Sequence, residues 1–225
     1  MQNHILTTQE LFAPGHTRAW AHLSGYEYPW EILAEIKDII REVGATLPPD
    51  EYNHPAEDIW IARSARIAPT AYIGAPAIIG ADTEVRHGAF IRGAALVGDG
   101  CVVGNSVELK NCILFDGVQV PHYNYVGDSV LGYKAHMGAG AVTSNVKSDR
   151  TLVSVRAGDE VLETRLKKMG AILGDRVEVG CNSVLNPGTV IGADSNIYPL
   201  SSVRGTVPPR CILKSGKGTE IVEKQ

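Results

Sequence analysis

Residues 73–103 read IGAPAIIGADTEVRHGAFIRGAALVGDGCVV. A large aliphatic residue recurs here at every sixth position, and glycine often follows it, as in Ile73-Gly74 and Val97-Gly98. A helix repeats near 3.6 residues and a simple strand near 2, so neither element explains the spacing. A period of six is typical of a short strand and a tight corner, three times in each coil of a solenoid.

The spacing continues on both sides of this stretch. The residue four places after each aliphatic position is mostly small, as at Ala77 and Ala95. Because stacked coils pair their strands in parallel, the repeated residues would fill one continuous interior. The sequence therefore predicts an all-β solenoid, a left-handed parallel β-helix of hexapeptide repeats, over residues 57–213. The aliphatic or aromatic positions are Ile61, Ile67, Ile73, Ile79, Val85, Ile91, Val97, Val103, Leu109 and Phe115, and then Leu173, Val179, Leu185, Ile191, Ile197 and Val203.

Both ends of the chain lack the repeat. Residues 1–56 contain an amphipathic helical pattern over 30–43, with Gly44 as its stop signal. A solenoid needs its exposed ends covered, so we expect an N-terminal helical extension that caps the first coil or packs on a neighbouring subunit. Residues 214–225 form a C-terminal tail that we expect to be partly flexible, with Ile221-Val222 adding an edge strand.

The composition of the chain disfavours several classes of protein. The 225 residues carry 21 Lys and Arg against 25 Asp and Glu, a net charge of −4, which disfavours a nucleic-acid partner. No apolar run suits a membrane span and the start shows no secretory signal, so we expect a cytoplasmic protein without a membrane partner. The four cysteines form no CxxC pair and no histidine cluster completes a zinc pattern, so free thiols and no metal are expected.

The repeat first fails between Phe115 and Leu131, whose separation in the chain is not a multiple of six. The interval holds Pro121-His122-Tyr123-Asn124-Tyr125, where the repeat calls for aliphatic and small residues. Positions where local rules fail are candidate functional sites, so this stretch is the first candidate. The alternative is a bulge that only bends the coil.

Two cations lie near this break. Arg92 and Lys110 are separated by one full coil of three repeats, so they should stack on one face about 4.8 Å apart. Stacked cations repel one another unless an anion joins them, and a phosphate-bearing ligand would do this. The alternative is a pair of solvated cations that Glu108 partly compensates.

A longer irregular stretch covers residues 144–170. Valines on either side of Ala157-Gly158-Asp159 predict a strand–turn–strand excursion from the solenoid. The basic residues Arg165, Lys167 and Lys168 follow it. Such a loop could lie over the phosphates of a nucleotide-containing cofactor, and the alternative is a solvated charged loop.

Specific motifs accompany the repeat. They are Val103-Gly-Asn-Ser-Val-Glu108-Leu-Lys110, His122-Tyr-Asn-Tyr125-Val-Gly-Asp128, Gly138-Ala-Gly140 and Thr143-Ser-Asn145. In order and spacing these motifs resemble the acetyltransferase half of the bifunctional glucosamine-1-phosphate N-acetyltransferase/N-acetylglucosamine-1-phosphate uridyltransferases, over about residues 57–213. The segment 164–175 is more similar to sugar-1-phosphate nucleotidyltransferases with the same β-helix tail. The chain shows no nucleotidyltransferase domain, so no pyrophosphorylase activity is expected.

The resemblance implies roles for individual residues. His122 matches the catalytic base, which would take the proton from a sugar amine as the amine attacks the thioester of acetyl-CoA. Glu108 lies where a carboxylate could orient His122. Arg92 and Lys110 match cations that bind the sugar phosphate, and Tyr125 matches a substrate-contacting tyrosine.

The acetyl-CoA site is also implied by the resemblance. Ala139 and Asn145 match contacts to acetyl-CoA, while Cys181 and Pro199 replace a serine and an alanine that line it. We assign Lys167 of the basic loop to the phosphates of the same co-substrate. The family works as a trimer with its sites between subunits, so a homotrimer is expected.

Two further departures bear on activity. His136 replaces an asparagine of the family pattern, and Val146 replaces a tyrosine. We place His136 in the substrate site, as a second acid/base or as a hydrogen-bond donor to the acyl oxygen. The substitutions at His136, Val146 and Pro199 favour a non-catalytic β-helix over an enzyme.

The sequence predicts an enzyme, an acetyl-CoA-dependent N-acetyltransferase acting on an amino-sugar phosphate or a nucleotide-amino sugar. The alternative is a non-catalytic β-helix that binds a sugar nucleotide or assembles with a separate nucleotidyltransferase. A sugar O-acetyltransferase would use the same base. A zinc hydratase of the γ-carbonic anhydrase kind needs two closely spaced histidines, whereas His87, His122 and His136 lie far from one another in the sequence.

Overall fold

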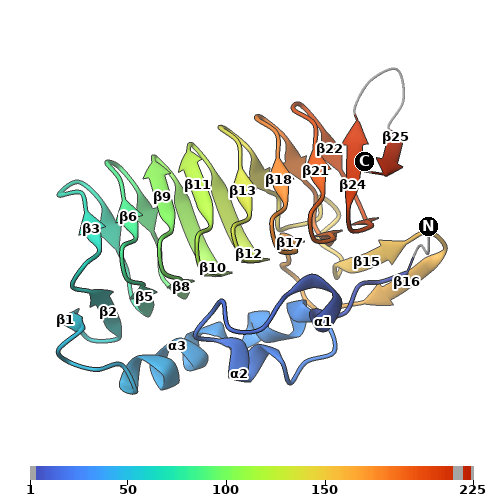
Figure 1. Cartoon of the computed structure of the whole chain (residues 1–225). Helices are drawn as coiled ribbons and strands as arrows, with labels where there is room; N and C mark the ends of the chain where they lie inside the picture. The colour runs from blue at the N-terminus through green and yellow to red at the C-terminus, as the bar shows by residue number, and fades with distance from the viewer. Residues whose placement is uncertain (1–3, 215–219, 224–225) are drawn as a thin grey trace.

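The computed structural model describes residues 4–214 and 220–223. Its strands stack into a parallel solenoid, visible in Figure 1 as a row of coils from β3 (Arg66–Ile67) to β24 (Cys211–Lys214). Corresponding residues of successive coils pair in register along three separate faces, shown by Ala77 with Ala95, Glu84 with Val102, and Tyr72 with Phe90. The expected β-solenoid is confirmed.

We number the faces in chain order within one coil. Face 1 contains β2 (Ile59–Ala62), β5 (Ala77–Ile79), β8 (Ala95–Val97), β17 (Ala171–Leu173), β20 (Thr189–Ile191) and β23 (Thr206–Val207). Face 2 contains β3 (Arg66–Ile67), β6 (Glu84–Val85), β9 (Val102–Asn105), β11 (Gln119–His122), β13 (His136–Met137), β18 (Glu178–Val179), β21 (Asn196–Ile197) and β24 (Cys211–Lys214). Face 3 contains β4 (Tyr72–Ile73), β7 (Phe90–Ile91), β14 (Val142–Thr143), β19 (Val184–Leu185) and β22 (Ser202–Val203). The strands β10 (Glu108–Leu114) and β12 (Tyr125–Leu131) run from face 3 around the corner into face 1.

The interior is a column of aliphatic side chains. On face 1 it is formed by Ile79, Val97, Leu114 and Leu131, which pair in register and are all fully buried. Each such side chain contributes roughly 1.5–3 kcal/mol on burial. Because each coil stacks on the one before it, the position of any residue on the surface is set by its place within the coil.

The structure corrects the position of the break in the repeat. Leu114 pairs with Val97, and Leu131 pairs with Leu114, so two successive coils are each one residue shorter than the regular coil that joins Ile79 to Val97. Leu114 therefore continues the column, and the expectation that Phe115 does so was wrong. The Phe115 ring instead packs against Phe12, with ring centroids 4.8 Å apart.

Both short coils are one residue shorter at the corner between faces 3 and 1. Asn111 and Asp128 occupy this corner with φ of 50° and 49°, a left-handed conformation that Asn and Asp tolerate better than most residues. Val120 pairs with Val103 and Val126 with Leu109, so the chain around His122 makes a regular corner. The break is thus at Asn111 and Asp128 and not at His122.

Face 1 is buried on its outer side as well. Ile78, Leu96, Ile113 and Val130 alternate with inward residues, yet each is at most 1% exposed. The segment containing α1 (Thr8–Leu11), α2 (Trp20–Leu23), η1 (Pro29–Ala34) and α3 (Ile36–Ala45) lies along this side of the solenoid (Figure 1), with α3 against β5, β8 and β10 and η1 against β12.

The N-terminal extension covers both the side and the first edge of the solenoid. The helices lie beside the coils because the outward residues of face 1 offer them an apolar surface, whereas β1 (Tyr52–Ala56) covers the edge of β2 as an antiparallel neighbour. Gly44 does not stop the helix: it lies within α3, where a Cβ atom would come within 2.5 Å of the Trp60 ring. None of the described helices is both long and apolar enough to cross a membrane.

The excursion at residues 144–170 completes the cover of face 1. The strands β15 (Ser154–Ala157) and β16 (Glu160–Glu163) form an antiparallel hairpin, which confirms the predicted strand–turn–strand. Val153 and Val155 are fully buried, and β15 packs against β20 and β23. At the C-terminus, β25 (Glu220–Glu223) pairs antiparallel with β24, which confirms the edge strand, while 215–219 and 224–225 lie outside the described residues.

Truncation of Ile113 tests whether the N-terminal segment is part of the core. We expect Ile113→Ala to lower the free energy of unfolding by about 2–5 kcal/mol, because it leaves a cavity between β10 and α3. Val184→Ala, at an outward position of the uncovered face 3, should cost less than about 1 kcal/mol. Urea denaturation followed by circular dichroism measures both, and equal losses would contradict the arrangement.

Candidate active site

Four of the predicted site residues form a column at the corner between faces 2 and 3. Gly140 N–H donates to the His122 carbonyl at 3.0 Å, Asn182 N–H to that of Ala139 at 2.8 Å, and Leu200 N–H to that of Cys181 at 2.9 Å. His122, Ala139, Cys181 and Pro199 therefore follow one another along the solenoid axis, and we call them the corner column. The side chains of His122 and Cys181 are exposed.

A second group surrounds Asp128 at the corner between faces 3 and 1. The Asp128 residue is 4% exposed, and its carboxylate accepts hydrogen bonds from Lys110 Nζ at 2.9 and 3.0 Å and from Asn111 Nδ2 at 2.9 Å. Asn145 Nδ2 donates to the same carboxylate and, at 3.1 Å, to the Tyr125 hydroxyl. We call these five residues the Asp128 cluster.

Tyr125 lies across the surface of face 3 toward this cluster. A Cβ atom on Gly127 would come within 2.4 Å of the Tyr125 hydroxyl, so the missing side chain makes room for the phenol. Burial, followed by the carboxylates of Asp128 and Glu108, raises the pKa of Tyr125 above its ordinary value. The phenol is therefore protonated at neutral pH and can act as a hydrogen-bond donor.

Arg92 and Lys110 line a cavity of about 400 Å³ between the solenoid corner and the segment joining η1 to α3. Lys37 of α3 lines the same cavity and is exposed. Arg92 forms an ion pair with Glu108 at 2.7 Å, and Lys110 forms one with Asp128. Three cations thus line the cavity and two carboxylates pair with them, so a net positive charge remains to which a phosphate group could bind.

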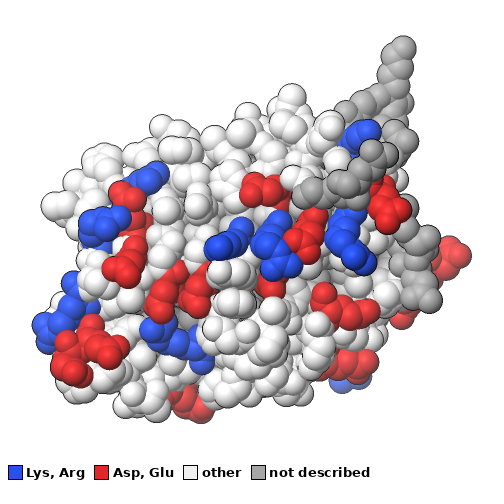
Figure 2. Space-filling view, viewed as in Figure 1, with Lys and Arg blue, Asp and Glu red and all other residues white. Residues whose placement is uncertain are grey.

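Glu108 does not accompany His122. Its carboxylate binds Arg92, and within the described ranges no hydrogen bond or ion pair joins Glu108 to His122. Of the two histidines predicted for the site, His136 has a carboxylate partner: its Nδ1 lies 2.7 Å from Glu178 Oε2. This pair is on the outer side of face 2, where Figure 2 shows acidic and basic side chains intermixed.

The predicted site residues therefore divide between several places. His122, Ala139, Cys181 and Pro199 come together in the corner column, and Lys110, Tyr125 and Asn145 in the Asp128 cluster, with Arg92 and Glu108 beside it. His136 lies on face 2, away from both groups along the coil. Lys167 is exposed in the segment after β16 and does not line the cavity of Arg92 and Lys110.

The sequence did not predict the roles of two residues in these sites, Asp128 and Lys37. Asp128 was read only as part of a motif, although the change of coil length at Asn111 and Asp128 is a signal for it. Lys37 belongs to the segment without a repeat, so no spacing relates it to Arg92. Among residues 4–214 and 220–223, no group of three or more His, Cys, Asp and Glu side chains is placed to hold a metal ion.

Comparison with known proteins places these residues in context. The family model described as the GMPPB C-terminal domain matches residues 78–197, just over half of the chain. The bifunctional sugar-1-phosphate nucleotidylyltransferase/acetyltransferase of Sulfurisphaera tokodaii is 36% identical over 102 residues, covering 45% of this chain and 25% of that protein. The bifunctional protein GlmU of Methanococcus maripaludis is 37% identical over 93 residues, covering 41% and 22%.

The aligned part thus spans about a quarter of the length of these curated relatives. The resemblance to the acetyltransferase half of bifunctional sugar-phosphate enzymes is confirmed by the matches. Among solved structures, that of the Francisella novicida UDP-N-acetylglucosamine acyltransferase is similar with a TM-score of 0.49 and 15% identity, covering 74% of this chain and 67% of that one.

Removal of the Asp128 charge tests the cluster. We expect Asp128→Asn to lower the free energy of unfolding by about 1–3 kcal/mol, because Lys110 loses its partner where the carboxylate is buried. Glu108→Gln breaks the more exposed pair with Arg92 and should cost less than about 1 kcal/mol. Urea unfolding at neutral pH compares the two variants, and a larger loss for Glu108→Gln would refute the ranking.

Proposed function

The chain belongs to the family of the GMPPB C-terminal domain, and from this premise we propose that it transfers an acetyl group from acetyl-CoA to the amine of an amino-sugar phosphate or a nucleotide-amino sugar. The relatives named as acetyltransferases support this class of reaction. In the proposed reaction the amine nitrogen attacks the thioester carbon, the carbon–sulfur bond breaks, and His122 accepts the proton that the nitrogen loses.

The corner column is the observation that carries the proposal. His122, Ala139, Cys181 and Pro199 occupy four successive coils, so they extend over about 14 Å at a strand spacing near 4.8 Å. A long, narrow ligand such as the arm of an acyl-CoA could lie along this line with its thioester next to His122. Most of the catalytic effect would then come from holding the amine and the thioester together beside a base.

The acceptor would place its phosphate in the cavity of Arg92, Lys110 and Lys37. Tyr125 lies between that cavity and the corner column, where its protonated hydroxyl could donate to a sugar oxygen. Glu108 would position Arg92 in this arrangement, which replaces its predicted role beside His122. Asn145 holds both Tyr125 and Asp128 and would thus order the acceptor site.

Assembly into a homotrimer is part of the proposal. Faces 2 and 3 have no cover from the described segments, and Tyr72, Phe90, Tyr123 and Val184 are exposed apolar residues on face 3 and its corner. Burial of these side chains against another copy would remove apolar surface from water. A cytoplasmic location stays a prediction from the sequence.

Acetyl-CoA turnover tests the proposed activity. Thiol release would be measured with glucosamine 1-phosphate, galactosamine 1-phosphate and UDP-amino sugars as acceptors. We expect His122→Ala to lower the rate by about 10²–10⁴-fold, as loss of a general base does. His87→Ala is the matched control, because His87 is exposed at the same corner in an earlier coil.

Two results would contradict this assignment. If His136→Ala lost turnover whereas His122→Ala kept the wild-type rate, His136, paired with Glu178, would be the base. Absence of turnover with every acceptor, together with no binding of CoA, would favour the non-catalytic binding module.

A further inference from the structure

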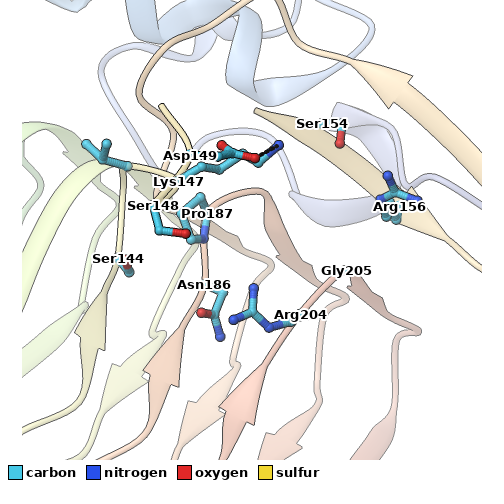
Figure 3. A pocket seen from close by; sticks show the side chains of 11 residues that line it. Ser144, Lys147, Ser148, Asp149, Ser154, Arg156, Asn186, Pro187, Arg204 and Gly205 are labelled. Carbon is cyan, nitrogen blue, oxygen red and sulfur yellow. Dashed lines mark ion pairs between the residues drawn. The ribbon is translucent and has the colours of Figure 1, made fainter. Parts of the chain in front are cut away.

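A cavity of about 500 Å³ shares no lining residue with the corner column, the Asp128 cluster or the cavity of Arg92 and Lys110. It forms where the excursion folds back on the corner between faces 3 and 1. Figure 3 shows Lys147, Ser148 and Asp149 of the loop on one side, Arg156 of the hairpin on another, and Asn186 and Arg204 of the coils below. We call it the Arg156–Arg204 pocket.

The charge of this pocket is unbalanced. Arg156 and Arg204 are exposed, and across residues 4–214 and 220–223 no hydrogen bond or ion pair occupies either guanidinium. Lys147 Nζ donates to Thr151 Oγ1 at 2.6 Å and lies 3.8 Å from Asp149, the one carboxylate among the lining residues. Two guanidinium groups facing one hollow present paired N–H donors that match phosphate oxygens.

Rigid elements hold both arginines in place. Arg156 lies between Val155 and Ala157, which are 0% and 1% exposed, so its backbone is fixed in the hairpin. The hairpin approaches the coils closely because Gly188 and Gly205 lack side chains: a Cβ atom would lie 2.4 Å from the Ser154 carbonyl oxygen and 3.0 Å from that of Arg156. The cavity is therefore built by packing and is not a chance gap between mobile loops.

Other lining groups suit a nucleotide better than a bare ion. Ser144, Ser148 and Ser154 supply hydroxyl groups, and the lining also includes Val146, an apolar side chain that is 43% exposed. A volume of about 500 Å³ lies within the ordinary range for small-molecule sites.

We propose that the Arg156–Arg204 pocket binds the diphosphate of a nucleotide-containing ligand. This diphosphate belongs either to CoA or to a nucleotide joined to the acceptor sugar, since both share the chemistry that the two arginines recognise. The choice between these ligands rests on the proposed function, whereas the anion site itself does not. The cation of the excursion that contacts phosphate is then Arg156 and not Lys167, and Arg204 of the coils completes the site.

Isothermal titration calorimetry tests the pocket with three probes: inorganic pyrophosphate, CoA and UDP. We expect Arg156→Gln and Arg204→Gln each to weaken pyrophosphate binding by about tenfold or more, since a hydrogen bond to a charged group is worth at least that much. Arg210→Gln removes an exposed arginine outside the pocket and should leave binding unchanged. Unaltered circular dichroism would confirm that the variants are folded.

The probes separate the sources of the diphosphate. If the arginine variants bind CoA more weakly and UDP as before, the pocket belongs to the acyl donor. If they bind UDP more weakly and CoA as before, it belongs to the acceptor. The proposal would be overturned if the wild type did not bind pyrophosphate, or if a variant carrying both Arg156→Gln and Arg204→Gln bound it as tightly as the wild type. Binding of pyrophosphate that depends on both arginines in a protein without acetyl transfer would retain the pocket and reject the proposed function.

Discussion

The register between stacked coils is the constraint on which the rest of the structure depends. Each strand pairs with the strand at the same place in the next coil, so surface residues far apart in sequence line up along the axis. His122, Ala139, Cys181 and Pro199 are unevenly spaced in the sequence and still follow one another at one corner. The long interval from Ala139 to Cys181 is possible because the excursion leaves and rejoins the solenoid without shifting the register.

The cover of face 1 determines which surfaces are free to act. The outward residues of this face are apolar. The N-terminal segment buries one part of them and the hairpin buries the rest. Both covering segments then contribute cations to cavities at the same corner, Lys37 from α3 and Arg156 from β15. Elements that stabilise the fold thereby also shape the places where phosphate groups could bind.

Much of this architecture was readable from the repeat, because the period of six records which side chains enter the interior. The aliphatic positions from Ile61 to Leu109 and the strand–turn–strand near Gly158 follow from local pattern alone. The replacement of Phe115 by Leu114 in the interior column could not be read from the repeat. Both residues are apolar, and a corner shortened by one residue shifts the six-residue repeat without changing the types of residue in it. The place of Lys37 beside Arg92 depends on packing between segments that no spacing relates.

The central claim is that the acyl donor lies along the corner column, and Cys181 offers a direct measurement of it. Cys181 is the exposed cysteine of the described chain, whereas Cys101, Cys112 and Cys211 are buried. The rate of Cys181 alkylation by iodoacetamide, followed by mass spectrometry of the intact protein, would be compared with and without saturating acetyl-CoA. The account predicts that acetyl-CoA at ten times its dissociation constant slows alkylation by about tenfold, in proportion to the occupied sites. An unchanged alkylation rate under conditions where acetyl-CoA is bound would contradict it.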